Sequence, residues 1–71
     1  MAKIYKTDGT VEETSDLSLE NMQKAVGGYI EIYRHFVVNE EGLLIGLPTN
    51  PFYRQFVGNV IVLSSKELRG L

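Results

Sequence analysis

Short apolar runs alternate with turn-forming residues along this chain, and the first such pattern predicts a β-hairpin. Residues 3–6 and 11–13 flank the sequence Thr7-Asp8-Gly9-Thr10. An Asp-Gly pair between two extended runs favours a hairpin turn, because both residues tolerate positive φ. We therefore expect the chain to open with two antiparallel strands.

The next segment has the signals of an amphipathic helix. Ser18 suits the N-cap position, and Leu19, Met22 and Val26 have the spacing of an apolar stripe on one face. Gly27 suits the left-handed position that ends a helix. The pattern predicts a two-turn helix over residues 18–26 that packs on a sheet.

A second hairpin is expected after this helix. Residues 29–33 alternate between polar and apolar side chains, Arg34-His35 marks a bend, and residues 36–38 can pair back on them. The next sequence, Asn39-Glu40-Glu41-Gly42, has asparagine at the first and glycine at the fourth position of a type I turn. We expect this turn to end the hairpin.

Three elements and a tail are predicted after residue 42. Residues 43–47 are an apolar run of strand length, and Pro51 suits the first turn of a short helix that Asn50 would cap. Residues 60–63 are Val-Ile-Val-Leu, the best candidate for a central strand. Residues 64–71 have the composition of a polar C-terminal tail.

These elements predict a single compact α+β domain over residues 1–63. It would have a small, mainly antiparallel sheet of four to six short strands, one amphipathic helix and a second short helix. The chain has 71 residues, no cysteine and a single histidine, His35, so neither a disulfide nor a Cys/His zinc site can supplement a small core. Self-association is therefore an expected source of additional stability.

Charge and hydropathy limit the classes of partner. The net charge is -2, and the seven lysine and arginine residues form no run, which argues against a nucleic-acid surface. No apolar stretch is long enough for a signal peptide or a membrane span. We expect a cytoplasmic protein that has no membrane partner.

Three motifs carry a resemblance to a known family. They are Gly27-Gly28-Tyr29-Ile30-Glu31, Asn39-Glu40-Glu41-Gly42 and Gly46-Leu47-Pro48-Thr49-Asn50, in this order. Together they resemble a family of small domains of unknown function that occurs in bacteriophages and in mobile elements of bacteria. The resemblance implies a compact α+β domain in such a setting, without an assigned activity. Phe52-Tyr53-Arg54 departs from the family pattern, which more usually has small residues there.

Residues that could carry chemistry have simpler structural explanations. Glu40 and Glu41 are neighbours in a turn and point in different directions, and His35 has no recognisable nucleophile beside it. Gly27-Gly28 closes a helix, whereas a phosphate-binding loop opens one. We therefore expect no enzymatic activity, no metal site and no cofactor.

A binding surface is the remaining functional prediction. Tyr29, Glu31 and Tyr33 would lie on one face of a strand as an aromatic and acidic patch that a subunit, a ligand or solvent must cover. Other residues that could contribute to a partner or ligand surface are Arg34, Asn50, Tyr53 and Arg54. An anion could also bind near Asn50 and Arg54, at the start of the predicted second helix.

Two functions fit these features. In the first, the chain is a small non-catalytic phage or mobile-element accessory protein that binds a host protein and modulates it. In the second, it is a small oligomeric protein that sequesters a nucleotide-like signalling molecule. The first is preferred, because the sequence has tyrosines typical of interfaces but no cluster of basic residues.

Overall fold

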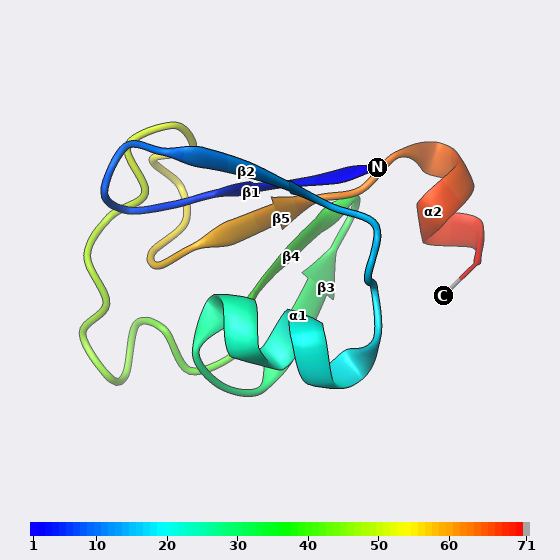
Figure 1. Cartoon of the computed structure of the whole chain (residues 1–71). Coiled ribbons are helices and arrows are strands. Elements are labelled where there is room, and N and C mark those ends of the chain that lie inside the picture. The colour runs from blue at the N-terminus through cyan, green and yellow to red at the C-terminus, as the bar shows by residue number, and fades with distance from the viewer. Residues whose placement is uncertain (71) are drawn as a thin grey trace.

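A five-stranded antiparallel sheet forms the centre of the computed structural model, which describes residues 1–70 (Figure 1). The strand order is β2-β1-β5-β4-β3, and all four neighbouring pairs are antiparallel. The strands are β1 (Ala2–Tyr5), β2 (Val11–Thr14), β3 (Ile30–Tyr33), β4 (Phe36–Asn39) and β5 (Val60–Val62). The α+β class is confirmed, as is the central position of the strand that begins at Val60.

Helix α1 (Leu19–Val26) covers one face of the sheet (Figure 1). The Ser18 side chain accepts a hydrogen bond from the backbone N–H of Asn21, and Gly27 has a φ of 83°, so both predicted caps are confirmed. Met22 and Val26 are buried in the core, which also contains residues of β1, β4 and β5. Leu19, the first residue of α1, is 57% exposed, so the prediction that it faces the sheet is wrong. The apolar stripe of the helix therefore supplies one of the two layers that cover the sheet.

Aromatic side chains cover the opposite face of the sheet. The register places Tyr5, Phe36 and Tyr33 on the face that points away from α1. Residues 40–59 pass along the left side of the view in Figure 1. Their rings, from Phe52, Tyr53 and Phe56, pack on this face. The rings form edge-to-face or tilted pairs with centroids 5.1 to 6.2 Å apart: Tyr5–Phe52, Tyr5–Tyr53, Phe36–Tyr53, Phe36–Phe56 and Tyr33–Phe56.

The prediction of a strand over residues 43–47 is wrong, because this segment forms turns. The N–H of Ile45 donates to the carbonyl of Glu41, and the N–H of Leu47 donates to the carbonyl of Gly42, both at 3.0 Å. Both edges of β4 are already paired, with β3 and β5, so this apolar run has no place beside β4. The predicted type I turn is supported, since the N–H of Gly42 donates to the carbonyl of Asn39.

The short helix predicted after Pro51 is also wrong. The Asn50 side chain does cap the following N–H groups, of Phe52 and Tyr53, but the chain then makes turns instead of a helix. The rings of Phe52 and Tyr53 both pack on Tyr5. This tertiary packing outweighs the local preference for a helical turn.

The second helix of the protein is α2 (Ser65–Arg69), inside the segment expected to be a polar tail. Ser64 and Glu67 form a capping box, in which each side chain accepts a hydrogen bond from the other residue's backbone N–H. Leu68 packs against the hydrophobic core. Leu71, the last residue of the predicted tail, lies outside the described residues.

Candidate functional site

Three asparagine side chains attach residues 40–59 to the rest of the fold. At one end, Asn39 donates to the carbonyl of Val26 at 3.1 Å and accepts the N–H of Glu41 at 2.8 Å. Asn39 thereby joins the end of α1 to the turn that leaves β4. Gly28 lies against this side chain, because a Cβ built on Gly28 would meet the Asn39 amide nitrogen at 3.0 Å.

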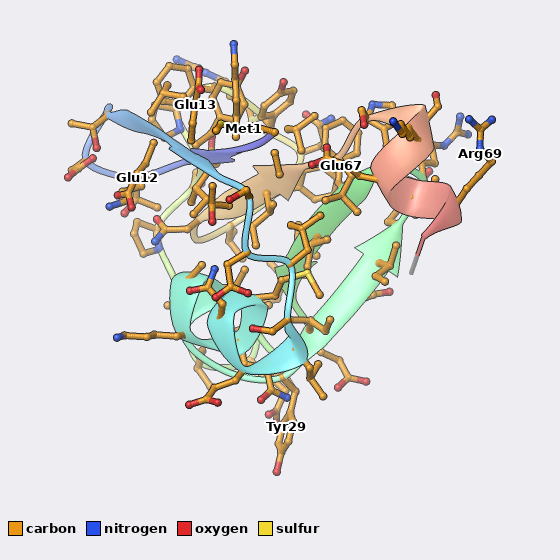
Figure 2. All side chains as sticks on the ribbon, turned by 45° about the vertical axis from the view of Figure 1, so that its right-hand side comes forward. Met1, Glu12, Glu13, Tyr29, Glu67 and Arg69 are labelled. Carbon is orange, nitrogen blue, oxygen red and sulfur yellow. The ribbon has the colours of Figure 1, made fainter. Side chains whose placement is uncertain are left out.

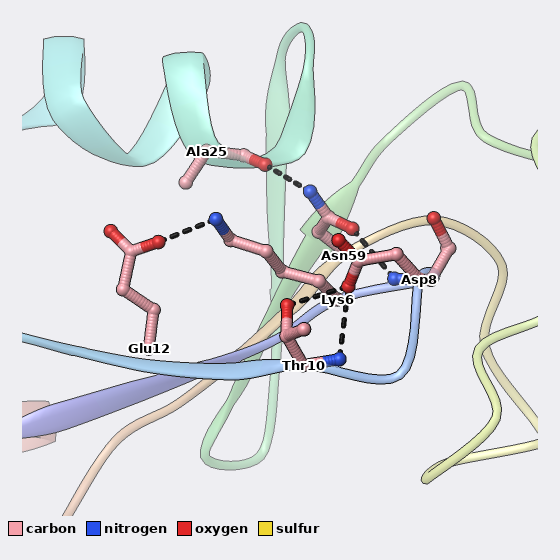
Figure 3. A network of polar contacts seen from close by, with 7 residues as sticks. Lys6, Asp8, Thr10, Glu12, Ala25 and Asn59 are labelled. Carbon is pink, nitrogen blue, oxygen red and sulfur yellow. Dashed lines mark hydrogen bonds and ion pairs between the residues drawn. The ribbon is translucent and has the colours of Figure 1, made fainter.

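At the other end of the segment, Asn59 joins the first hairpin to α1. Its amide donates to the carbonyl of Ala25, and its oxygen accepts the N–H of Thr7, both at 3.0 Å. Figure 3 shows this connection beside the turn of the hairpin, where Asp8 accepts two hydrogen bonds from Thr10. The two ends of residues 40–59 are thus fixed to α1.

Asn50 anchors the middle of the segment and is fully buried. Its amide donates to the carbonyls of Tyr5 and Gly58, both at 2.9 Å. Its oxygen accepts the N–H groups of Phe52 and Tyr53 at 2.9 and 3.0 Å. Because every hydrogen-bonding position of this amide is used inside the fold, Asn50 holds the loop and is not exposed to a ligand.

A groove of about 620 Å³ lies between β3 and the anchored loop. Tyr33, Val38 and Phe56 contribute apolar walls, and Glu31 and Glu40 contribute carboxylates. Leu43 and Leu44 also line it. The groove is therefore an apolar depression with acidic groups at its rim, which is typical of a binding site with few polar contacts.

The side chains of Leu43 and Leu44 are unusually exposed for leucines, at 84% and 85%. Ile45 follows them and is 57% exposed. Hydrogen bonds within the turns order the backbone of this segment, which carries these side chains on the surface. We name Leu43, Leu44 and Ile45 the apolar turn; contiguous exposed apolar groups beside a groove indicate an interaction surface.

The predicted aromatic and acidic patch is only partly brought together. Glu31 and Tyr33 both line the groove, on the same face of β3. Tyr29 precedes the strand, is 65% exposed and extends away from the molecule below α1 (Figure 2). It borders a separate depression of about 250 Å³. The groove therefore receives two of the three residues of the predicted patch.

Arg34, Tyr53 and Arg54 lie outside the groove lining that the described residues form. Arg34 occupies the tight turn between β3 and β4 with a φ of 57°, and its guanidinium carbon lies 5.5 Å from the centre of the Tyr33 ring. Burial, followed by the neighbouring Tyr5, raises the pKa of Tyr53 above its ordinary value of 10.0. Tyr53 is therefore a neutral member of the aromatic layer at physiological pH.

The sequence reasoning missed the apolar turn as a surface, because a run of apolar residues is also the pattern of a buried strand. The available signal was its position directly after Asn39-Glu40-Glu41-Gly42 and before Gly46, which has a φ of 74°. Two turn-forming glycines only four residues apart leave little room for a strand.

The described residues contain no group of three or more His, Asp or Glu side chains placed to hold a metal ion. His35 packs against the Phe36 ring, with centroids 4.4 Å apart. Within residues 1–70 neither helix has the length and apolar character needed to span a membrane.

The fold and the groove define a small α+β domain in which a sheet carries one helix on one face and an anchored, aromatic-rich loop on the other. A family profile described as "Domain of unknown function (DUF3846)" matches residues 2–70, and the chain belongs to this family. Searches of curated proteins and of solved structures found no match.

Proposed function

We propose that this protein is a non-catalytic accessory protein of a bacteriophage or mobile element, which binds a host protein in the cytosol and modulates its activity. The observation that carries the proposal is the apolar turn, in which Leu43 and Leu44 are 84% and 85% exposed beside a groove of about 620 Å³. Membership in a family without an assigned activity is compatible with this role.

The energetics of the apolar turn favour a protein partner. Complete burial of a leucine side chain contributes about 1.5 to 3 kcal/mol relative to exposure. The fold forgoes this contribution at both leucines, while Asn39 and Asn50 hold the surrounding loop in place. A surface that is already ordered loses little conformational entropy when a partner covers it, which strengthens association.

The charges of the groove support a protein segment better than a nucleotide-like ligand. Glu31 and Glu40 line the groove, and among the described residues no lysine or arginine does so. Phosphate groups would meet these carboxylates with like charge. Lys6 and Lys24 share another hollow, but Lys6 is paired there with Glu12.

Affinity capture with matched variants tests the proposal. The tagged protein is incubated with a lysate of the bacterial host, and the recovery of each retained protein is compared with the recovery by Leu44→Ser. Loss of one buried leucine should weaken binding about 10- to 150-fold, because each tenfold change in affinity corresponds to about 1.4 kcal/mol. A specific partner should therefore be retained by the parent protein and lost by Leu44→Ser.

Val11→Ser is the matched control, because Val11 is also exposed but lies in β2, at the other edge of the sheet. This variant should retain the partner as the parent does. Recovery of every retained protein by Leu44→Ser at the parent level would contradict the proposal, as would the absence of any retained protein.

A further inference from the structure

Strand β3 is an open edge of the sheet. It is the last strand in the order β2-β1-β5-β4-β3, and its strand partner within the described residues is β4. Edge strands present unpaired N–H and C=O groups that can pair with a strand of another chain. The groove and the apolar turn lie next to this edge, since Glu31 and Tyr33 of β3 form part of the groove lining.

The hydrogen-bond pattern identifies which backbone groups of β3 are free. The N–H of Glu40 donates to the carbonyl of Tyr29 at 2.8 Å, and Ile30 lies opposite Asn39. Ile30 and Asn39 are therefore a pair without mutual hydrogen bonds, and such pairs recur at every second residue of an antiparallel ladder. It follows that the N–H and C=O groups of Ile30 and Ile32 point away from β4.

The side chains of β3 define the residues that an added strand should carry. Glu31 lies at the groove, whereas Ile32 lies on the α1 face with 45% of its surface exposed. Ile30 shares the α1 face and is half-buried. Directly opposite residues on neighbouring strands interact most strongly, so Glu31 favours a cation across from it and the isoleucines favour apolar neighbours.

We propose, as an extension of the proposed function, that the host protein supplies an extended segment which pairs with β3 as a sixth strand of the sheet. This segment carries a lysine or arginine opposite Glu31, with an apolar residue on each side of it. Backbone hydrogen bonds to Ile30 and Ile32 hold the segment, and the acidic groove selects its central side chain.

A second copy of this chain is a poor occupant of the same edge. Two-fold pairing of β3 with itself, centred on Glu31, places Ile30 opposite Ile32 of the other copy and Glu31 opposite the other Glu31. Like charges directly opposite destabilise a strand pair. A shift toward the C-terminal end is blocked, because Arg34 has a φ of 57° and leaves the strand conformation.

The other edge of the sheet is protected more completely. Strand β2 carries Glu12 and Glu13 in succession, which puts a carboxylate on each of its two faces (Figure 2). Charged residues on both faces of an edge strand disfavour the addition of another strand. Strand β3 instead carries one glutamate, so its α1 face stays apolar and the edge selects a segment with a cation opposite Glu31.

A peptide titration followed by NMR tests the inference. The probe is a short blocked peptide with the pattern Thr-Val-Lys-Val-Thr, and the controls replace its lysine with glutamate or N-methylate the two valines. The lysine peptide should slow hydrogen exchange at the N–H groups of Ile30 and Ile32, and both controls should bind at least about tenfold more weakly. Unchanged exchange with the lysine peptide, or equal binding of all three peptides, would overturn strand addition.

A variant of the protein gives a second test. Ile32→Pro removes an N–H that makes no hydrogen bond within the sheet, and edge strands tolerate proline at such positions. Ile32→Thr is the matched control, which shortens the apolar surface and keeps the N–H. The lysine peptide should bind Ile32→Thr within about threefold of the parent and Ile32→Pro at least about tenfold more weakly. If circular dichroism shows that Ile32→Pro is unfolded, the N-methylated peptide makes the same comparison on the parent protein.

The captured host protein separates the two proposals. Retention that depends on Leu44 but is unchanged in a folded Ile32→Pro variant would overturn strand addition and leave the proposed binding function intact. Loss of retention in both variants supports strand addition. Absence of any Leu44-dependent partner would overturn the proposed function. The peptide titration tests strand addition at β3 independently of any captured partner.

Discussion

Replacement of Asn50 by alanine should remove one hydrogen bond that joins residues 40–59 to β1 and three that hold the segment together. The Asn50 side chain is fully buried and makes four hydrogen bonds, two as donor and two as acceptor. The substitution leaves the carbonyls of Tyr5 and Gly58 without this donor. It also leaves a void where the amide was.

The expected loss of stability follows from these contacts. A typical hydrogen bond contributes about 0.5 to 1.5 kcal/mol net, and a buried group left without a partner costs about 1 to 3 kcal/mol. The four bonds therefore give about 2 to 6 kcal/mol, and we expect a loss of about 3 to 4 kcal/mol. A small domain is stabilised by about 0.05 to 0.15 kcal/mol per residue, so this loss is a large part of the total.

Urea unfolding monitored by far-ultraviolet circular dichroism and tyrosine fluorescence measures the change. Gln55→Ala is the control, because Gln55 is exposed in the same loop and should change stability by less than about 0.5 kcal/mol. A loss below about 1 kcal/mol for Asn50→Ala would refute the argument that this amide anchors the loop.

Three further predictions concern other parts of the chain. Glu31→Gln removes the like-charge pair that opposes pairing between copies at β3, so analytical ultracentrifugation should detect more dimer than for the parent; an unchanged monomer fraction would contradict this. Gly58→Ala should lower the free energy of unfolding by about 1 to 3 kcal/mol, because Gly58 has a φ of 80° and a Cβ there would meet Leu47 at 2.7 Å. Gly9→Ala is the control and should lower it by less, because a Cβ at Gly9 meets no atom within 4 Å. The pKa of Glu67 lies below its ordinary value of 4.5, because the carboxylate accepts a hydrogen bond from the Ser64 N–H. The stabilisation of α2 by this carboxylate is therefore complete above pH 4.5 and is lost as the pH falls through the lowered pKa. NMR of the α2 amides at a series of pH values should show this loss, and Glu67→Gln should abolish the pH dependence.

The elements that the sequence predicted correctly are those with local signals. The cap at Ser18, the left-handed glycine at Gly27 and the Asp8-Gly9 hairpin each depend on residues only a few positions apart. Such interactions form from neighbouring groups whatever the rest of the chain does. The strand that begins at Val60 was also predicted correctly, because a run of four apolar residues suits a strand that has neighbours on both sides.

The predictions that failed depend on contacts between distant residues. Residues 43–47 are apolar like a buried strand, but β4 already has two neighbours and no edge is left beside it. The region after Pro51 makes turns because its rings pack on Tyr5, which is more than 45 positions away in the sequence. The capping box of Ser64 and Glu67 was a visible signal for α2 that the composition of the segment obscured.

The candidate site was predictable only in part, for the same reason. Alternation along β3 correctly placed Glu31 and Tyr33 on one face, and the register confirms it. The groove itself also needs Leu43 and Leu44, whose position depends on the buried asparagines and the turns between them. Asn50 was a candidate for ligand contact, and its complete burial gives it the role of an anchor.

Hydrogen–deuterium exchange of the protein, alone and with its captured partner, tests most directly whether the groove beside β3 is the binding surface. We expect slower exchange over residues 29–34 and 40–46 when the partner is bound, with β2 and α2 unchanged. Slower exchange confined to β2 or α2, or no change over residues 29–34 and 40–46, would contradict it.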